Sequence, residues 1–161
     1  MKRAPALFAA ALLALCSAAA AAQALPKPGP RDLCPVCGML VSKYPHWTAT
    51  AVWKDGRAVY FDGAKDMFKY LLNLAAYEKG RKREEIGALS VTEFYDLKPI
   101  DARQAWYVIG SDVLGPMGHE LVPLATRADA EDFVKDHKGR RVLRFDDVTA
   151  ELLAQLDGGK F

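Results

Sequence analysis

The same order of expected elements occurs twice along this chain, and this repeat constrains the fold more than any other feature. In the first half, residues 47–53 and 58–61 predict two strands joined by an Asp-Gly turn. Asp62 is expected to cap a helix whose apolar residues follow helical spacing up to about Tyr77. Residues 89–95 then alternate like a further strand.

The second half repeats this order. Residues 105–109 and 120–124 predict strands on either side of a glycine-rich loop. Thr126 is expected to cap a helix that stops at Gly139, and residues 141–145 predict another strand. Each half therefore has the order strand, strand, helix, strand.

This repeated order predicts the fold class. Since each antiparallel sheet needs a helix to cover one face, we expect an α+β protein made of two related ββαβ units, with antiparallel sheets and helices packed on one face. The first unit is expected at 47–97. The second is expected at 98–161 and ends in a helix capped by Asp146. An extended tether at 25–46, which begins with three prolines and a glycine, precedes both units and carries two cysteines.

Residues 1–24 have the features of an export signal. A positive pair of residues precedes an apolar stretch that ends at Leu15, and residues 22–24 offer an A-x-A-like cleavage site. The apolar run is too short to span a bilayer, so we expect export rather than a membrane-spanning anchor. Cys16 could instead become a lipidated N-terminus, although Leu15 stands where small residues are usual. We therefore expect a soluble periplasmic protein, with a lipoprotein as the alternative.

Cleavage of this signal would change the charge balance. The whole chain carries 22 basic and 20 acidic side chains, and loss of Lys2 and Arg3 leaves 20 of each. A formally neutral protein lacks the basic surface of nucleic-acid-binding proteins, so we expect no nucleic-acid partner. Cleavage also removes Cys16 and leaves only Cys34 and Cys37. In an oxidising compartment such a pair commonly forms a disulfide.

Cys34 and Cys37 form a Cys-x-x-Cys motif that is followed directly by Gly38 and Met39. In an exported protein this spacing fits a structural disulfide, a dithiol oxidoreductase, half of a zinc site or a soft-metal site. An oxidoreductase usually has a low-pKa cysteine at the start of a helix, whereas here a glycine and a strand-like segment follow. Structural zinc usually needs four ligands, and the three histidines of the chain are isolated. The disulfide is therefore the main alternative to a soft-metal site.

A second sulfur-bearing loop, at 115–119, favours the soft-metal site. Pro116 fixes the backbone and the flanking glycines admit close approach to Met117, a frame that a core methionine does not need. Met39 has a similar glycine beside it. His119 could add a nitrogen donor, although a solvent-exposed turn histidine is an equal alternative. Thiolates and thioethers suit a soft, low-coordinate cation, above all Cu(I). The candidate metal ligands are Cys37, Met117, Met39, Cys34 and His119.

Further motifs occur in an order that is more specific than any of them alone. They are the turn Phe61-Asp62-Gly63, the helix start Lys65-Asp66-Met67-Phe68, the strand Ala105-Trp106-Tyr107-Val108, the segment from Gly110 to Gly118, and Glu120-Leu121-Val122-Pro123. Together with the Cys-x-x-Cys-Gly-Met segment, they make nearly the whole mature chain resemble the NosL family of nitrous-oxide-reductase accessory proteins.

The resemblance implies an exported Cu(I)-binding carrier, not an enzyme, that helps to deliver copper for the copper-sulfide centre of nitrous oxide reductase. Its partners would be that reductase or its other maturation factors, and the copper donor is unknown. The resemblance also implies a two-unit ββαβ architecture similar to a domain of the organomercurial lyases. Many members are membrane-tethered lipoproteins, although the leucine before the signal cysteine disfavours a tether here.

Carried over position by position, the resemblance points to Cys37 as the thiolate donor and Met117 as the thioether donor. The residues competing for the remaining positions are Met39, Cys34 and His119. Two other classes stay open. One is an enzyme, either a periplasmic thiol-disulfide oxidoreductase or, by kinship of fold, a protein acting on carbon–mercury bonds. The other is a disulfide-stabilised module whose glycine-rich loop binds a protein.

Overall fold

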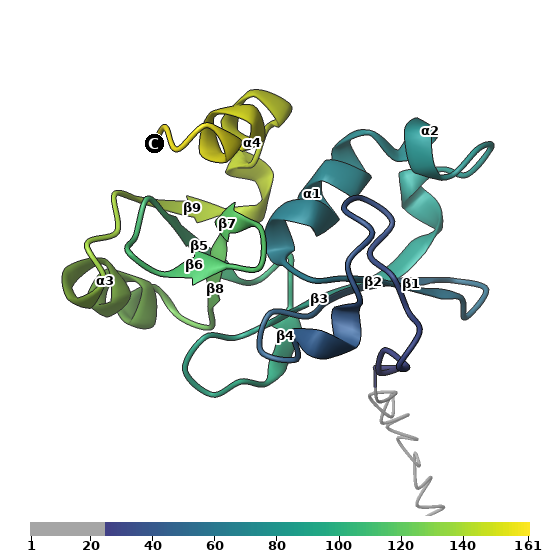
Figure 1. Cartoon of the computed structure of the whole chain (residues 1–161), viewed down its shortest axis with the longest axis horizontal. Coiled ribbons are helices and arrows are strands. Elements are labelled where there is room, and N and C mark those ends of the chain that lie inside the picture. Colours follow the sequence, from purple (N-terminus) through teal and green to yellow (C-terminus); the bar gives the residue numbers. More distant parts are fainter. Residues whose placement is uncertain (1–24) are drawn as a thin grey trace, which may run out of the picture.

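A computed structural model describes residues 25–161 (Figure 1). The expected export signal, its cleavage site and Cys16 lie outside the described residues. The elements, in chain order, are the 3-10 helix η1 (Val41–Lys43), β1 (Ala49–Trp53), β2 (Ala58–Phe61), α1 (Ala64–Leu72), α2 (Leu74–Tyr77), η2 (Arg83–Glu85), β3 (Ile86–Thr92), β4 (Pro99–Asp101), β5 (Trp106–Ile109), β6 (Leu114–Gly115), β7 (Gly118–His119), β8 (Val122–Leu124), α3 (Arg127–Asp136), β9 (Arg141–Arg144), η3 (Phe145–Asp147) and α4 (Ala150–Asp157). Within residues 25–161, no helix has the length and apolar character needed to cross a lipid bilayer.

Two antiparallel sheets share one strand order. The first sheet has the order β2-β1-β3-β4 and the second has the order β8-β5-β9. In the first sheet β1 lies between β2 and β3, and in the second β5 lies between β8 and β9. In each unit a helix, α1 or α3, connects the second strand to the third. The expected α+β protein with two ββαβ units is confirmed. β4, which follows residue 97, pairs with β3 and so completes the first sheet. The division of the chain into domains stays a prediction.

The β1–β2 hairpin forms as its turn sequence predicts. Gly56 has a φ of 89°, in the left-handed region that favours glycine, and Asp55 accepts a hydrogen bond from the backbone nitrogen of Arg57 at 3.0 Å. The register of the hairpin places Phe61 opposite Ala49. The chain therefore leaves β2 directly into the turn that begins α1.

The helix expected up to about Tyr77 is interrupted. α1 ends at Leu72 and α2 begins at Leu74, because Asn73 has φ −128° and ψ 46°, outside the helical region. As a result, Leu72 and Ala75 are exposed instead of lying on a buried face.

Two of the three expected helix caps are wrong. Thr126 caps α3 as expected, through a hydrogen bond from the third residue of the helix. α4 is capped by Thr149, because Asp146 lies within the preceding 3-10 helix η3. Asp62 does not cap α1, because Gly63 occupies the N-cap position. The carboxylate of Asp62 is therefore available for another contact.

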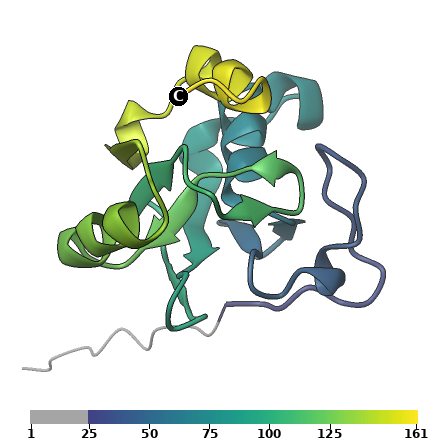
Figure 2. The ribbon, with the colours of Figure 1, turned by 60° about the vertical axis from the view of Figure 1, so that its left-hand side comes forward.

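α1 lies at the centre of the molecule and joins the two units (Figures 1 and 2). It packs against β1 and β2 of the first sheet and against α4. Phe68 of α1 also meets Tyr107 of β5 edge-on, with 5.2 Å between the ring centroids. One hydrophobic core therefore runs through both units. A smaller core between the second sheet and α3 consists of Val108, Val122, Leu124, Ala130 and Phe133.

Candidate metal centre

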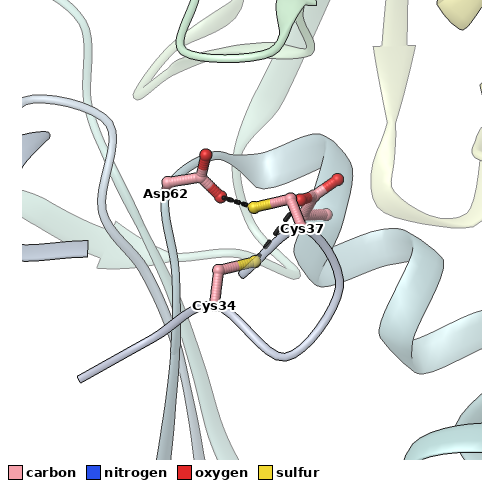
Figure 3. A group of neighbouring side chains, drawn as sticks. Cys34, Cys37 and Asp62 are labelled. Atoms are coloured by element: carbon pink, nitrogen blue, oxygen red, sulfur yellow. Dashed lines mark hydrogen bonds between the residues drawn. The ribbon is translucent and has the colours of Figure 1, made fainter. Parts of the chain in front are cut away.

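The loop from Cys34 to Met39 is held closed by its own backbone. The Cys34 nitrogen donates to the Met39 carbonyl at 2.9 Å, and the Gly38 nitrogen donates to the Cys34 carbonyl at 2.8 Å. Gly38 has a φ of 77°, which glycine adopts without the strain that a Cβ atom would add. An isolated β-bridge between Leu33 and Leu40 closes the base of the loop. This tight turn brings both cysteine sulfurs to the start of α1 (Figure 3).

Two carboxylates from the start of α1 face these thiols. The Cys37 sulfur donates to Asp62 Oδ1 at 3.1 Å, and the Cys34 sulfur donates to Asp66 Oδ2 at 3.3 Å (Figure 3). Asp66 lies in the first turn of α1, whereas Asp62 precedes the N-cap Gly63, so the two carboxylates reach the thiols from the helix and from the turn before it. One ligand atom from each of the four residues lies within 4.8 Å of the others. We call this group the cysteine–aspartate cluster.

The cluster is buried and carries unsatisfied oxygens. The side chains of Cys34, Asp62 and Asp66 are each 2% exposed or less, whereas Cys37 is half-buried. Asp62 Oδ2 and Asp66 Oδ1 are buried and accept no hydrogen bond from the residues that the structure describes. Such an unpartnered group costs about 1–3 kcal/mol, and more when it is charged. The ammonium of Lys69, 3.7 Å from Asp66, offsets part of this charge. The cluster is therefore suited to a cation.

Burial keeps both cysteines protonated at neutral pH. It raises the pKa of Cys34 to about 11. It raises the pKa of Cys37 further still, with hydrogen bonds to Asp62 and Asp66 acting in the same direction. Both are free thiols in the described chain, and the motif leads into the short η1 at Val41 rather than opening an α-helix. These features are the opposite of the low-pKa cysteine of a dithiol oxidoreductase. A metal ion would bind the thiolates and displace their protons.

The β6–β7 hairpin, which carries the second sulfur-bearing loop, is attached to the same end of α1. The ammonium of Lys65 donates to the carbonyl oxygens of Met117 at 2.9 Å and His119 at 2.7 Å. Lys65 is buried and directly precedes Asp66 of the cluster. The cysteine loop and the β6–β7 hairpin therefore both contact the start of α1, the first through Asp66 and the second through Lys65 (Figures 1 and 2). The side chain of Met117 is 44% exposed.

The other predicted ligands take different positions around the cluster. Cys34 and Cys37 form part of it. Met39 is partly exposed in the same loop, and its carbonyl closes the turn. The ring of His119 packs edge-on against Phe161, with 4.8 Å between the ring centroids. Among residues 25–161, the cluster contains no histidine nitrogen.

The sequence interpretation missed two members of the cluster. It assigned a capping role to Asp62 and no ligand role to Asp66. Asp66 lies within the apolar-patterned helix, directly before Met67 and Phe68, whereas no local pattern marks Asp62 as facing inward. The sequence alone did not show that the cysteine loop lies opposite them.

The fold and the cluster define a small α+β protein with a candidate metal centre. The sequence profile of the NosL family matches residues 27–153. The copper-binding lipoprotein NosL of Stutzerimonas stutzeri is 30% identical over 135 residues, which cover 77% of this chain and 65% of that relative. This chain thus spans somewhat less than two thirds of the relative's length.

A solved structure agrees with this similarity. The crystal structure of the copper chaperone NosL from Shewanella denitrificans resembles this fold with a TM-score of 0.65 and 26% identity, covering 79% of this chain and 96% of that one. The chain belongs to the NosL family.

Proposed function

We propose that this protein is an exported Cu(I) carrier that delivers copper for maturation of the copper-sulfide centre of nitrous oxide reductase. The observation that carries the proposal is the pair of thiols, one buried and one half-buried, that faces two carboxylates. Each carboxylate has a buried oxygen that accepts no hydrogen bond within residues 25–161. The relatives support copper as the cargo, because one is named a copper-binding lipoprotein and another a copper chaperone.

The sulfur atoms favour Cu(I) over other common cations. A soft monovalent ion prefers thiolate and thioether ligands and accepts few of them. In our proposal Cys37 and Met117 bind the ion, with Cys34 as the second thiolate. Met39 and His119 are the further candidates. Zn(II) is the relevant competitor, because it accepts sulfur and carboxylate ligands in tetrahedral sites.

The unequal exposure of the sulfur atoms supports a carrier. Cys34 is buried, Cys37 is half-buried and the Met117 side chain is 44% exposed. In our proposal a docked partner first replaces the exposed thioether and then the thiolates, so the ion passes by ligand exchange. No bond of an organic substrate is made or broken, and the protein acts as a carrier rather than an enzyme.

The place of action in our proposal is the periplasm. The S. stutzeri relative is named a lipoprotein, so a lipid on Cys16 is the alternative to cleavage before Gln23 or Leu25. We expect cleavage, because the A-x-A-like sites fit signal processing better than Leu15 before Cys16 does. N-terminal mass analysis of the exported protein distinguishes the two forms.

A metal competition experiment tests the proposed cargo. The reduced mature protein is titrated with Cu(I) and, separately, with Zn(II), each against a chromophoric chelator. We expect one Cu(I) ion per chain and much weaker retention of Zn(II). Retention of Zn(II) as tight as that of Cu(I), or tighter, would contradict the proposal.

A further inference from the structure

A buried lysine and a buried glutamate join α1 to the β6–β7 hairpin in both directions. Lys65 is 1% exposed and Glu120 is 3% exposed. From the helix side, the Lys65 ammonium donates to the carbonyls of Met117 and His119 and lies 3.1 Å from Asp157 Oδ1. From the hairpin side, Glu120 Oε1 accepts a hydrogen bond from the backbone nitrogen of Lys65 at 2.6 Å. Each element therefore satisfies polar groups of the other.

Two glycines make room for this arrangement. A Cβ atom at Gly63 would overlap the carboxylate of Glu120, and one at Gly115 would lie 3.0 Å from Glu120 Cγ. Gly63 is the N-cap of α1, and Gly115 is the last residue of β6. The Glu120 carboxylate is thus enclosed between the helix and the hairpin. It takes the place that a capping side chain would have at the start of α1.

The hairpin depends on this attachment for its position. β6 and β7 have two residues each, and so short a two-stranded hairpin is not stable by itself. The exposed side chain of Met117 offers little packing to hold the loop. Its main chain is held by Lys65, next to Asp66 of the cluster. Burying a lysine and a glutamate is costly, and they need a dense set of partners such as this one.

We propose that Lys65, with Glu120 as its partner, is the positioning residue that places the Met117 loop at the copper site. The inference rests on the proposed function. Lys65 does not itself bind copper, because its ammonium is occupied by the hairpin carbonyls. It holds the Met117 loop beside the cysteine–aspartate cluster, so that one ion can bind sulfur atoms from both segments.

The substitution Lys65→Met tests this role, because it removes the ammonium and keeps an unbranched apolar side chain. We expect Cu(I) affinity to fall by about 10- to 100-fold, as is typical when a residue that supports metal ligands is lost. Adding Met117→Leu should then cause little further loss, because that donor is already displaced. Lys135→Met is the control, because Lys135 also lies on a helix, α3, but is exposed and pairs with Asp132 at 2.8 Å. Within the described chain it has no hydrogen bond to the hairpin or to the cysteine–aspartate cluster. We expect it to bind Cu(I) nearly as the parent does.

Hydrogen exchange gives a readout that does not depend on copper. We expect faster amide exchange in residues 114–119 of Lys65→Met, whereas exchange in the two sheets should stay unchanged. In Lys135→Met, exchange in residues 114–119 should match that of the parent. Should Lys65→Met fail to fold, Gly115→Ala provides a milder change. It displaces the Glu120 side chain while keeping both the lysine and the glutamate, and we expect the same pattern of exchange and affinity.

The outcomes separate this inference from the proposed function. If the parent binds Cu(I) and Met117→Leu weakens it, while a folded Lys65→Met or Gly115→Ala variant binds like the parent, the positioning role is overturned and the carrier function stands. Parent-like binding by Met117→Leu would also overturn the positioning role. Failure of the parent to bind Cu(I) would contradict the proposed function and, with it, this inference.

Discussion

The two sulfur-bearing segments meet at the same end of α1 but are held there in different ways. The cysteine loop is fixed through its side chains, because Cys34 and Cys37 donate hydrogen bonds to buried aspartates. The β6–β7 hairpin is fixed through its main chain, by a lysine that binds the carbonyls on either side of Gly118. The Met117 side chain is left 44% exposed.

Because of this difference, the cysteine loop and the β6–β7 hairpin are suited to different roles in the proposed site. Cys34 is buried and Cys37 is half-buried, and the raised pKa values of both thiols keep them protonated until a metal ion binds. The exposed thioether carries no proton at neutral pH and is accessible to a partner. The cysteine loop is therefore suited to retention of the ion, and the hairpin is suited to its exchange. Substitutions in the two halves should differ accordingly.

The largest effect is expected from Cys37→Ser. Serine keeps the size and the hydrogen-bonding capacity of the side chain but is a poor ligand for Cu(I). We expect Cu(I) affinity to fall by more than the roughly 10- to 100-fold that follows loss of a supporting residue. Competition against a chromophoric Cu(I) chelator measures the change. Unchanged affinity would show that Cys37 does not bind the ion.

Met117→Leu should have a smaller effect on affinity and little effect on stability. Leucine has a similar volume, so the free energy of unfolding should change by less than about 1.5 kcal/mol, whereas Cu(I) should dissociate faster. The double variant with Cys37→Ser should lose less than the sum of the two single losses, because both act on one site. Met67→Leu, in the buried core of α1, is the control and should bind copper like the parent. If Cu(I) dissociates from the parent and from Met117→Leu at the same rate, the β6–β7 hairpin has no part in exchange of the ion.

The smallest effect is expected from Asp62→Asn, and it concerns the reactivity of the thiol. Burial is the main cause of the raised pKa of Cys37, and the hydrogen bond to the Asp62 carboxylate adds to it. Removing that negative charge should lower the pKa, so more thiolate forms at a given pH. We expect Cys37 to be alkylated modestly faster in Asp62→Asn than in the parent between pH 7 and about 9. Slower alkylation would show that Asp62 stabilises the thiolate rather than the thiol.

The parts of the fold that follow local rules were predictable from the sequence. The Asp-Gly turn set the β1–β2 hairpin, and Thr126 marked the start of α3. The strand expected at 89–95 is present but shifted to Ile86–Thr92, because its register is set by pairing with β1 and β4 rather than by its own alternation. Local propensity was therefore a good guide to the elements and a weaker guide to their ends.

The candidate site was predictable only in part, because long-range contacts complete it. The residue types alone pointed to the cysteines, which lie in the cluster, and to the Met117 loop, whose role as a ligand stays a prediction. Asp62 has a strong local preference for capping, which the contact with Cys37, 25 residues away, overrides. Lys65 would normally be placed on the solvent side of a helix, and only the hairpin, about 50 residues downstream, explains its burial.

The most direct test of the shared site is X-ray absorption at the copper edge of the Cu(I)-loaded protein. We expect a ligand shell dominated by sulfur in the parent protein. We further expect one sulfur ligand fewer in Met117→Leu and an unchanged ligand shell in Met67→Leu. A shell dominated by oxygen or nitrogen, or the same sulfur count in Met117→Leu as in the parent, would contradict the claim that the cysteine loop and the β6–β7 hairpin bind one copper ion together.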